Sequence, residues 1–246
     1  MALPWRGALI AKEQRSPVYQ GVLFLFRIKI CGITARVDGE AAFRAGADAV
    51  GFNFYVRSLR CISPEQANMI ASALPKSISR VGVFVNSSVD EIVRTLSHCP
   101  LDYVQLHGNE PIEMVNQLSD VAVIRAMRLG EDDLDEVAAR ANDWLSAGAA
   151  AVILDSLQRP GEFGGSGSIG NWAQARAVAS LVKGPFILAG GLDPENVRDA
   201  IDAVGPWGVD CASGVETFPG KKSSELMHQF VAAARAAFDA NPMGTP

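Results

Sequence analysis

A thiol and a carboxyl group stand at the ends of two short apolar segments that lie far apart in the chain. Cys31 comes directly before Gly32, and Asp155 follows the apolar run 151–154. The two groups suit proton transfer, because one can remove a proton while the other supplies one. In water neither is ready for this: a cysteine with a pKa near ~8.5 needs a cationic neighbour, and a carboxyl group needs burial to stay protonated near neutral pH.

Strand geometry predicts what lies beside these two candidates. Side chains alternate along a strand, so Lys29 shares the face of Cys31, while the isoleucines on either side of Lys29 pack against helices. Lys29 is therefore the nearest cation that could lower the pKa of the thiol. Taken singly, each candidate also fits an ordinary role, Cys31 as a small buried apolar residue and Asp155 as a helix cap.

Two glycine-containing turns, 189–192 and 212–214, predict a phosphate site. Glycine lets backbone N–H groups approach a dianion, and a short helix beginning in the second turn would add its N-terminal dipole. A glycine-rich stretch, 164–167, is expected to form a lid or part of the same anion site. The N–H donors expected in the two turns belong to Gly190, Gly191, Ser213 and Gly214.

Other polar residues occur where they would line the same site. Arg57 and Arg60 offer guanidinium groups that can bind a carboxylate in a fork, although solvated loop arginines are equally ordinary. Gln105 and His107 share one face of a predicted strand and would project inward. His, Cys and acidic residues show no spacing typical of a metal site, so we expect no metal.

The fold that must position these residues is an α/β barrel. From residue 27 onward, short β-rich apolar runs alternate with amphipathic helical stretches, which is typical of βα units around a parallel sheet. Eight such units predict a (β/α)8 TIM barrel, in which reacting groups stand at the carboxyl ends of the strands. The predicted strands are 27–31, 47–54, 80–85, 103–106, 121–126, 150–154, 185–189 and 207–211.

Local signals also predict helix starts and domain limits. Ser63, the stretch 87–90 and Asp193 each stand where a helix would begin, and a proline follows Ser63 and Asp193. We expect one barrel domain over residues 27–240, a tail at 241–246 and an N-terminal extension, 1–26, outside the barrel. The end of that extension, 22–26, has an alternative role as a short segment packed across the bottom of the barrel.

Composition narrows the possible partners. Lys and Arg number 22 against 27 Asp and Glu, a net charge of −5, and no basic stripe of the kind that follows a phosphate backbone is present, so we expect no nucleic acid partner. The apolar run 22–26 is too short to span a membrane. Four scattered cysteines without CxxC spacing are expected in a reducing cytoplasm. We expect a monomer or a homodimer that binds a small phosphorylated substrate.

Nine tracts, taken together and in order, resemble the phosphoribosylanthranilate isomerase family of tryptophan biosynthesis. The resemblance implies a (β/α)8 barrel that performs an Amadori rearrangement of N-(5-phosphoribosyl)anthranilate to 1-(2-carboxyphenylamino)-1-deoxyribulose 5-phosphate without a cofactor. It covers roughly residues 27–240. The tracts are 29–34 (KICGIT), 46–52 (GADAVGF), 57–60 with 62–64 (RSLR and ISP), 81–86 (VGVFVN), 104–108 (VQLHG), 153–155 (ILD), 164–167 (GGSG), 190–192 (GGL) and 213–216 (SGVE).

The resemblance also implies roles for individual residues. Asp155 matches the general acid that protonates the furanose ring oxygen, and Cys31 matches the base that takes the proton from C2. Arg60 matches the position that faces the anthranilate carboxylate. Other matched positions are the phosphate cradle of Gly190, Gly191, Ser213 and Gly214, and the polar lining of Gln105, His107 and Asp210.

The chain departs from the family pattern near the phosphate turns. Residues 168–172 read Ser-Ile-Gly-Asn-Trp where the family usually has Lys-Thr-Phe-Asp-Trp, so a lysine is lost while Asn171 keeps a helix cap. Ala189 and Ala212 stand where serine is commoner. These changes remove a positive charge at 168, a negative charge at 171 and the hydroxyl groups of two serines, but they leave Cys31 and Asp155 untouched. We therefore expect them to affect affinity rather than chemistry.

Three alternative functions remain open at this point. A sibling isomerase of the histidine pathway performs the same rearrangement but resembles a pair of aspartates at the two catalytic positions, and Cys31 argues against it. An aldolase would use Lys29 to form a Schiff base. A catalytically silent barrel would serve as a binding or scaffold protein, and it would need neither Cys31 nor Asp155.

Overall fold

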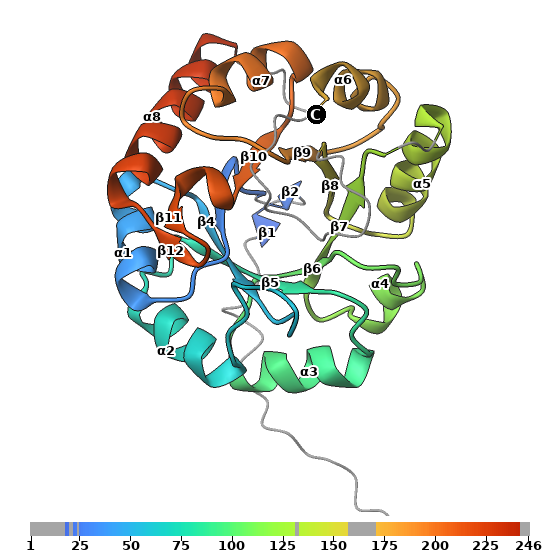
Figure 1. The fold of residues 1–246 in the computed structure, drawn as a ribbon. Helices are drawn as coiled ribbons and strands as arrows, with labels where there is room; N and C mark the ends of the chain where they lie inside the picture. Colours follow the sequence, from blue (N-terminus) through green and yellow to red (C-terminus); the bar gives the residue numbers. More distant parts are fainter. Residues whose placement is uncertain (1–17, 20–21, 24, 131–132, 157–170, 242–246) are drawn as a thin grey trace, which may run out of the picture.

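A computed structural model of the chain shows eight parallel strands closed into a barrel with helices outside it (Figure 1). The structure describes residues 18–19, 22–23, 25–130, 133–156 and 171–241. The (β/α)8 prediction is confirmed, and each predicted strand overlaps an observed one. In the order in which they pair around the barrel, the strands are β10 (Gly208–Cys211), β3 (Ile28–Cys31), β4 (Ala49–Asn53), β5 (Ser79–Phe84), β6 (Tyr103–Leu106), β7 (Ala122–Arg128), β8 (Ala151–Asp155) and β9 (Phe186–Ala189).

The helices form the outer ring of Figure 1. A short 3-10 helix, η1 (Ser213–Val215), and a hairpin of β11 (Glu216–Phe218) and β12 (Lys221–Lys222) follow β10. None of the helices in the described part of the chain is long and apolar enough to cross a membrane. The helices are α1 (Arg36–Ala45), α2 (Pro64–Ala73), α3 (Val89–His98), α4 (Met114–Gln117), α5 (Leu134–Ser146), α6 (Trp172–Ala179), α7 (Val197–Val204) and α8 (Ser224–Ala240).

Two of the three predicted helix starts are confirmed. Ser63 and Ser88 cap α2 and α3 with complete capping boxes, in which each serine side chain and the residue three positions later bond to each other's backbone. The start predicted at Asp193 is wrong, because α7 begins at Val197 with Asn196 as its N-cap. The Asp193 carboxylate instead accepts hydrogen bonds from the backbone N–H groups of Glu195 and Asn196, at 2.9 and 3.0 Å. These bonds form a local turn, and the helix begins after it.

The predicted alternation of side chains along β3 is confirmed. Ile28 and Ile30 are fully buried in the apolar layer between strands and helices. Lys29, between them, points into the barrel, where its Nζ lies 2.6 Å from Asp210 of β10. Because side chains of period two face opposite sides of a sheet, the same four-residue strand supplies both the outer core and the interior.

Leu25 and Phe26 belong to the barrel core, although the sequence analysis assigned them to an extension outside it. Both are buried together with inward-facing residues, and the Phe26 ring meets the edge of Tyr103 at a centroid distance of 5.6 Å. Tyr103 is the first residue of β6, so this contact closes the amino-terminal end of the barrel. The boundary after residue 26 is therefore wrong for these two residues, and packing across the barrel bottom describes them correctly. The preceding described segments, β1 (Val18–Tyr19) and β2 (Val22–Leu23), pair with each other.

Candidate active site

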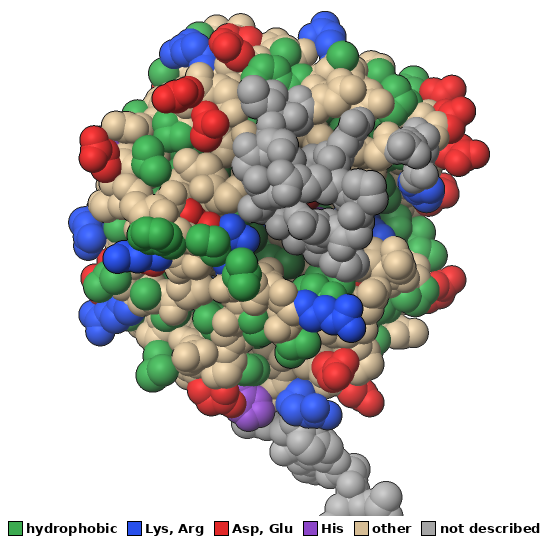
Figure 2. Space-filling view, viewed as in Figure 1, with side chains coloured by type: hydrophobic (Ala, Val, Ile, Leu, Met, Phe, Trp, Pro, Cys, Tyr) green, Lys and Arg blue, Asp and Glu red, His purple; other side chains and the backbone are tan. Residues whose placement is uncertain are grey.

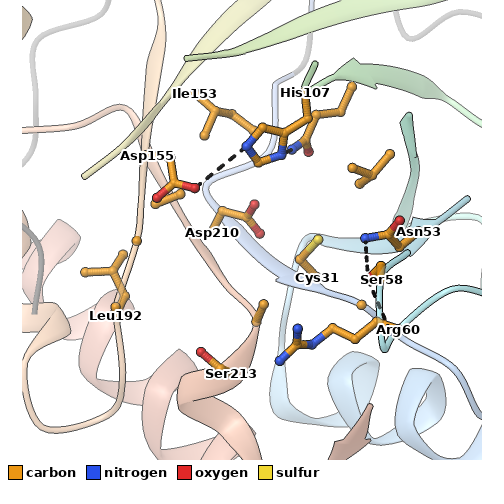
Figure 3. A pocket seen from close by; sticks show the side chains of 17 residues that line it. Cys31, Asn53, Ser58, Arg60, His107, Ile153, Asp155, Leu192, Asp210 and Ser213 are labelled. Atoms are coloured by element: carbon orange, nitrogen blue, oxygen red, sulfur yellow. Dashed lines mark hydrogen bonds and ion pairs between the residues drawn. The ribbon is translucent and has the colours of Figure 1, made fainter. Parts of the chain in front are cut away.

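Cys31 and Asp155, the two candidates for proton transfer, line one pocket at the carboxyl end of the barrel (Figure 3). Cys31 is the last residue of β3 and Asp155 the last of β8, so the strand ends bring them to the same mouth. In Figure 2 a hollow near the centre of the face has acidic and basic side chains beside it. The pocket also contains Arg60, Gln105, His107, Asp210, Gly190, Gly191 and Ser213, all predicted from the sequence.

Lys29 is next to Cys31, as predicted, but its charge is shared with an acid that sequence spacing does not show. Its Nζ donates to Asp210 at 2.6 Å, and the Lys29 side chain is completely buried. Burial alone would lower the pKa of Lys29, but Asp210 and Cys31 raise it above its ordinary value. Lys29 is therefore a charged ammonium that does not line the pocket.

Burial and the neighbouring charges shift the pKa of the Cys31 thiol in opposite directions. Burial raises the pKa of the thiol, Lys29 and Lys222 lower it, and Asp210 raises it again. The net result is a pKa above the ordinary value. The thiolate of Cys31 is consequently scarce in these surroundings but strongly basic once formed.

Gln105 and His107 form a polar chain that ends near Asp155. Gln105 lies in β6 and His107 directly follows that strand, and both line the pocket, as predicted. Gln105 Nε2 lies 3.3 Å from His107 Nδ1. The other ring nitrogen, Nε2, lies 3.7 Å from Asp155 Oδ2. Figure 3 shows the His107 imidazole directed toward the Asp155 carboxyl group. Asp155 is 4% exposed. Asp155 thus sits with little solvent contact beside a titratable ring.

Of the two arginines predicted at the mouth, Arg60 lines the pocket and Arg57 is exposed outside it. Arg60 binds Glu216 through two hydrogen bonds, from Nε at 2.7 Å and from Nη2 at 2.5 Å. Side-chain hydrogen bonding to Glu216 is the largest cause of a pKa of Arg60 above its ordinary value, so the guanidinium remains charged. Figure 3 shows this group directed toward Ser213 across the pocket.

The two predicted phosphate turns are present, with one difference. Gly190 and Gly191 adopt φ of 100° and 67°, values that favour glycine, and Ser213 begins η1. Gly214 does not line the pocket; a Cβ on it would lie 2.0 Å from the carbonyl oxygen of Leu192. Glycine is therefore needed there so that η1 can pack against the other turn.

The structure adds site residues that the sequence pattern did not indicate. Glu216, from the β11 and β12 hairpin, binds Arg60, and Lys222 from the same hairpin binds Glu216 in turn. Asn53 and Ser58 also line the pocket, and the Ser58 hydroxyl accepts from Asn53 and from the backbone of Arg60, both at 3.1 Å. Glu216 is the last residue of the SGVE tract, so the family resemblance could have indicated it as a site residue. No motif in the sequence near Lys222 indicated that residue.

Parts of the predicted loop after β8 lie outside the described residues, namely 164–167 and 168–170. Asn171 is described, and its side chain caps α6 by accepting from the backbone N–H of Gln174, as predicted. Among the residues that the structure describes, no group of three or more His, Cys, Asp or Glu side chains could hold a metal ion.

Comparison with known proteins decides the family. The profile of the family described as N-(5'phosphoribosyl)anthranilate (PRA) isomerase matches residues 28–233, which is most of the chain. The chain belongs to this family. A relative from Magnetococcus marinus, named N-(5'-phosphoribosyl)anthranilate isomerase, is 44% identical over 213 residues, which cover 87% of this chain and 97% of the relative.

Solved structures of the family share the barrel. The crystal structure of phosphoribosyl anthranilate isomerase from Thermotoga maritima is similar with a TM-score of 0.76 and 40% identity, covering 86% of this chain and all of that one. A second crystal structure, of the isomerase in complex with reduced 1-(o-carboxyphenylamino)-1-deoxyribulose 5-phosphate, has a TM-score of 0.72 and 38% identity, with coverage of 86% and 100%. The resemblance found in the sequence tracts is thereby confirmed.

Proposed function

We propose that this barrel isomerises N-(5-phosphoribosyl)anthranilate to 1-(2-carboxyphenylamino)-1-deoxyribulose 5-phosphate in tryptophan biosynthesis, with Asp155 as general acid and Cys31 as general base. Family membership supports the reaction. One observation carries the assignment of the two roles: the strand ends place a buried carboxyl group and a thiol in the same pocket.

Asp155 acts first. It donates a proton to the furanose ring oxygen, the bond between that oxygen and C1 breaks, and the nitrogen lone pair forms the C1=N bond of a Schiff base. Asp155 is only 4% exposed, so this transfer takes place with little solvent contact. His107, whose Nε2 lies 3.7 Å from the carboxyl group, is placed to exchange a proton with Asp155 between turnovers.

Cys31 acts second. Its sulfur takes the proton from C2, and the electrons of the C–H bond form C1=C2 while those of C1=N return to nitrogen. The resulting enolamine tautomerises to the ketone. Because burial raises the pKa of Cys31, its thiolate is a strong base, and Lys29 and Lys222 supply positive charge that stabilises it.

The remaining pocket residues orient the substrate. Arg60 faces the anthranilate carboxylate, and the backbone N–H groups of Gly190, Gly191 and Ser213 receive the phosphate. Within the described residues, two buried oxygens have no hydrogen-bond partner, Gln105 Oε1 and Asp210 Oδ1. Each can accept from a sugar hydroxyl group, which would satisfy an otherwise costly buried acceptor.

The decisive experiment follows the loss of substrate fluorescence in freshly generated phosphoribosylanthranilate. We expect rapid decay with the unaltered protein and none above background with Cys31→Ala or Asp155→Asn. Cys61→Ala and Asp120→Asn are matched controls, because Cys61 is a half-buried thiol outside the pocket and Asp120 an exposed carboxylate, and both should retain full activity. Undiminished turnover by Cys31→Ala would remove it as the base, and absence of decay with the unaltered protein would refute the reaction.

The structure favours the aldolase and the histidine-pathway isomerase less. An aldolase needs a neutral lysine that can reach its substrate, whereas Lys29 is buried, paired with Asp210 and absent from the pocket lining. A resemblance to the histidine-pathway isomerase would require an aspartate at the position where this chain has Cys31. A cytoplasmic location and a monomeric or homodimeric state stay predictions.

A further inference from the structure

Glu216 lies between two cations at the rim of the pocket. Arg60 donates two hydrogen bonds to it, and Lys222 Nζ lies 2.7 Å from its Oε1. The side chains of Arg60, Glu216 and Lys222 are 11%, 4% and 0% exposed, respectively, so the three form a largely buried cluster rather than a surface ion pair. Burial would raise the pKa of Glu216, but the hydrogen bonds and charges of Arg60 and Lys222 outweigh burial and lower it.

The hairpin after β10 holds the two new members of the cluster in place. Glu216 of β11 and Lys222 of β12 are direct cross-strand partners. Lys222 Nζ also donates to the carbonyl oxygen of Ala212, which lines the pocket, at 2.9 Å. The turn of the hairpin is attached to the loop after β3 by the hydroxyl of Thr34, which donates to the Gly220 carbonyl oxygen at 2.6 Å.

The charges in the cluster decide what it can bind. Arg60 and Glu216 alone sum to zero, and a substrate carboxylate approaching Arg60 would meet the repulsion of Glu216. Lys222 changes the sum to +1. The glutamate can then fix the direction of the guanidinium through two bonds without cancelling the attraction for an anion.

We propose that Lys222 is a positioning and specificity-determining residue, which offsets the charge of Glu216 so that Arg60 can hold the substrate carboxylate. This inference rests on the proposed function, in which Arg60 faces the anthranilate carboxylate. It assigns to Lys222 a part in substrate selection although its Nζ is hydrogen-bonded to protein groups and its side chain is completely buried.

The test compares two ligands that differ by one carboxyl group. The first is the reduced product, 1-(2-carboxyphenylamino)-1-deoxyribitol 5-phosphate, and the second is the same compound without the carboxyl group. Calorimetric titration at low ionic strength gives the ratio of their dissociation constants, which reports the carboxylate alone because both ligands carry the phosphate. The proteins are the unaltered chain, Lys222→Met, the double variant Glu216→Gln/Lys222→Met, and Lys221→Met as a matched control, since Lys221 is the exposed neighbour.

The unaltered chain and Lys221→Met should prefer the carboxylated ligand to the same degree. Lys222→Met should lose roughly tenfold of that preference while its affinity for the second ligand stays unchanged. The double variant removes one charge of each sign, keeps the net +1 and should regain most of the preference. If Lys222→Met does not fold, the double variant decides in the same way, because a lost preference in it contradicts the charge argument.

Other outcomes overturn the proposal, each in a distinguishable way. A preference in Lys222→Met equal to that of the unaltered chain shows that Lys222 does not serve the carboxylate. Equal weakening of both ligands shows a structural role for the hairpin only. If the unaltered chain itself has no preference, then the assignment of Arg60 in the proposed function fails and the role of Lys222 fails with it.

Discussion

Lys29 Nζ and Asp210 Oδ2 lie 2.6 Å apart inside the barrel, although 181 positions separate the two residues in the chain. They come from β3 and β10, the first and last strands of the barrel, which pair directly in the closed sheet. The lysine is completely buried and the aspartate is 8% exposed. The ion pair therefore links the two strands whose pairing closes the barrel, two residues before Cys31 in β3.

Replacing Lys29 by methionine should destabilise the fold strongly, because it leaves the Asp210 carboxylate buried without its cation. Loss of one partner of a buried pair costs about 3–5 kcal/mol, a large share of a typical domain stability of about 5–15 kcal/mol. Urea unfolding at pH 7 measures the change. The double variant Lys29→Met/Asp210→Asn should recover most of the loss, and a double variant as unstable as the single one would show that the charge is not the cause.

Gly32→Ala should weaken substrate binding through Arg60. Gly32 has φ of +77°, and a Cβ on it would lie 2.4 Å from Cδ of Arg60. Gly46→Ala is the matched control, since Gly46 has φ of +90° but its nearest neighbour to a Cβ is 3.6 Å away. Both variants should lose about 1–2 kcal/mol of stability from the left-handed backbone, but only Gly32→Ala should raise KM for phosphoribosylanthranilate. Equal KM values in the two variants would contradict the contact with Arg60.

Glu216 should make stability depend on pH in the acid range. Its pKa is lower in the folded protein than the ordinary value of 4.5, so its contribution is complete above pH 4.5 and disappears as the pH falls through the lowered pKa. We expect Glu216→Gln to melt below the unaltered chain at pH 7 and the gap in Tm to narrow below pH 4.5. Glu113→Gln, at an exposed glutamate, serves as control and should show little gap at any pH. A constant gap for Glu216→Gln would rule out the ionised carboxylate as the source.

Phe26→Ala should cost about 3–5 kcal/mol, because it removes a ring that is 2% exposed and packs against Tyr103. Phe218→Ala, at a ring that is 70% exposed, should change stability by less than about 0.5 kcal/mol. Thermal or urea unfolding of both variants tests whether residues 25 and 26 are part of the barrel. A negligible loss of stability for Phe26→Ala would show that residues 25 and 26 belong to the N-terminal extension and not to the barrel.

Much of the site was predictable because it depends on local rules. Strand alternation puts Cys31 and Lys29 on the inner face, and parallel strands bring their carboxyl ends to one mouth, so the meeting of Cys31 with Asp155 followed from the pattern. The serine caps of α2 and α3 likewise depend on a few adjacent residues. Asp193 misled because an aspartate can complete a turn as well as begin a helix, and the two choices have the same local signal.

The amino-acid sequence by itself determined the barrel, its strand ends, and the carboxyl group and thiol that line one pocket there, because periodicity and turn chemistry act over a few residues. Only the tertiary structure decided the charge partners. Arg60 and Glu216 are 156 positions apart, and their pairing depends on how the β11 and β12 hairpin folds back over the loop after β4. Electrostatic pairing is a property of distance in space, and burial strengthens it, so spacing along the chain cannot reveal it.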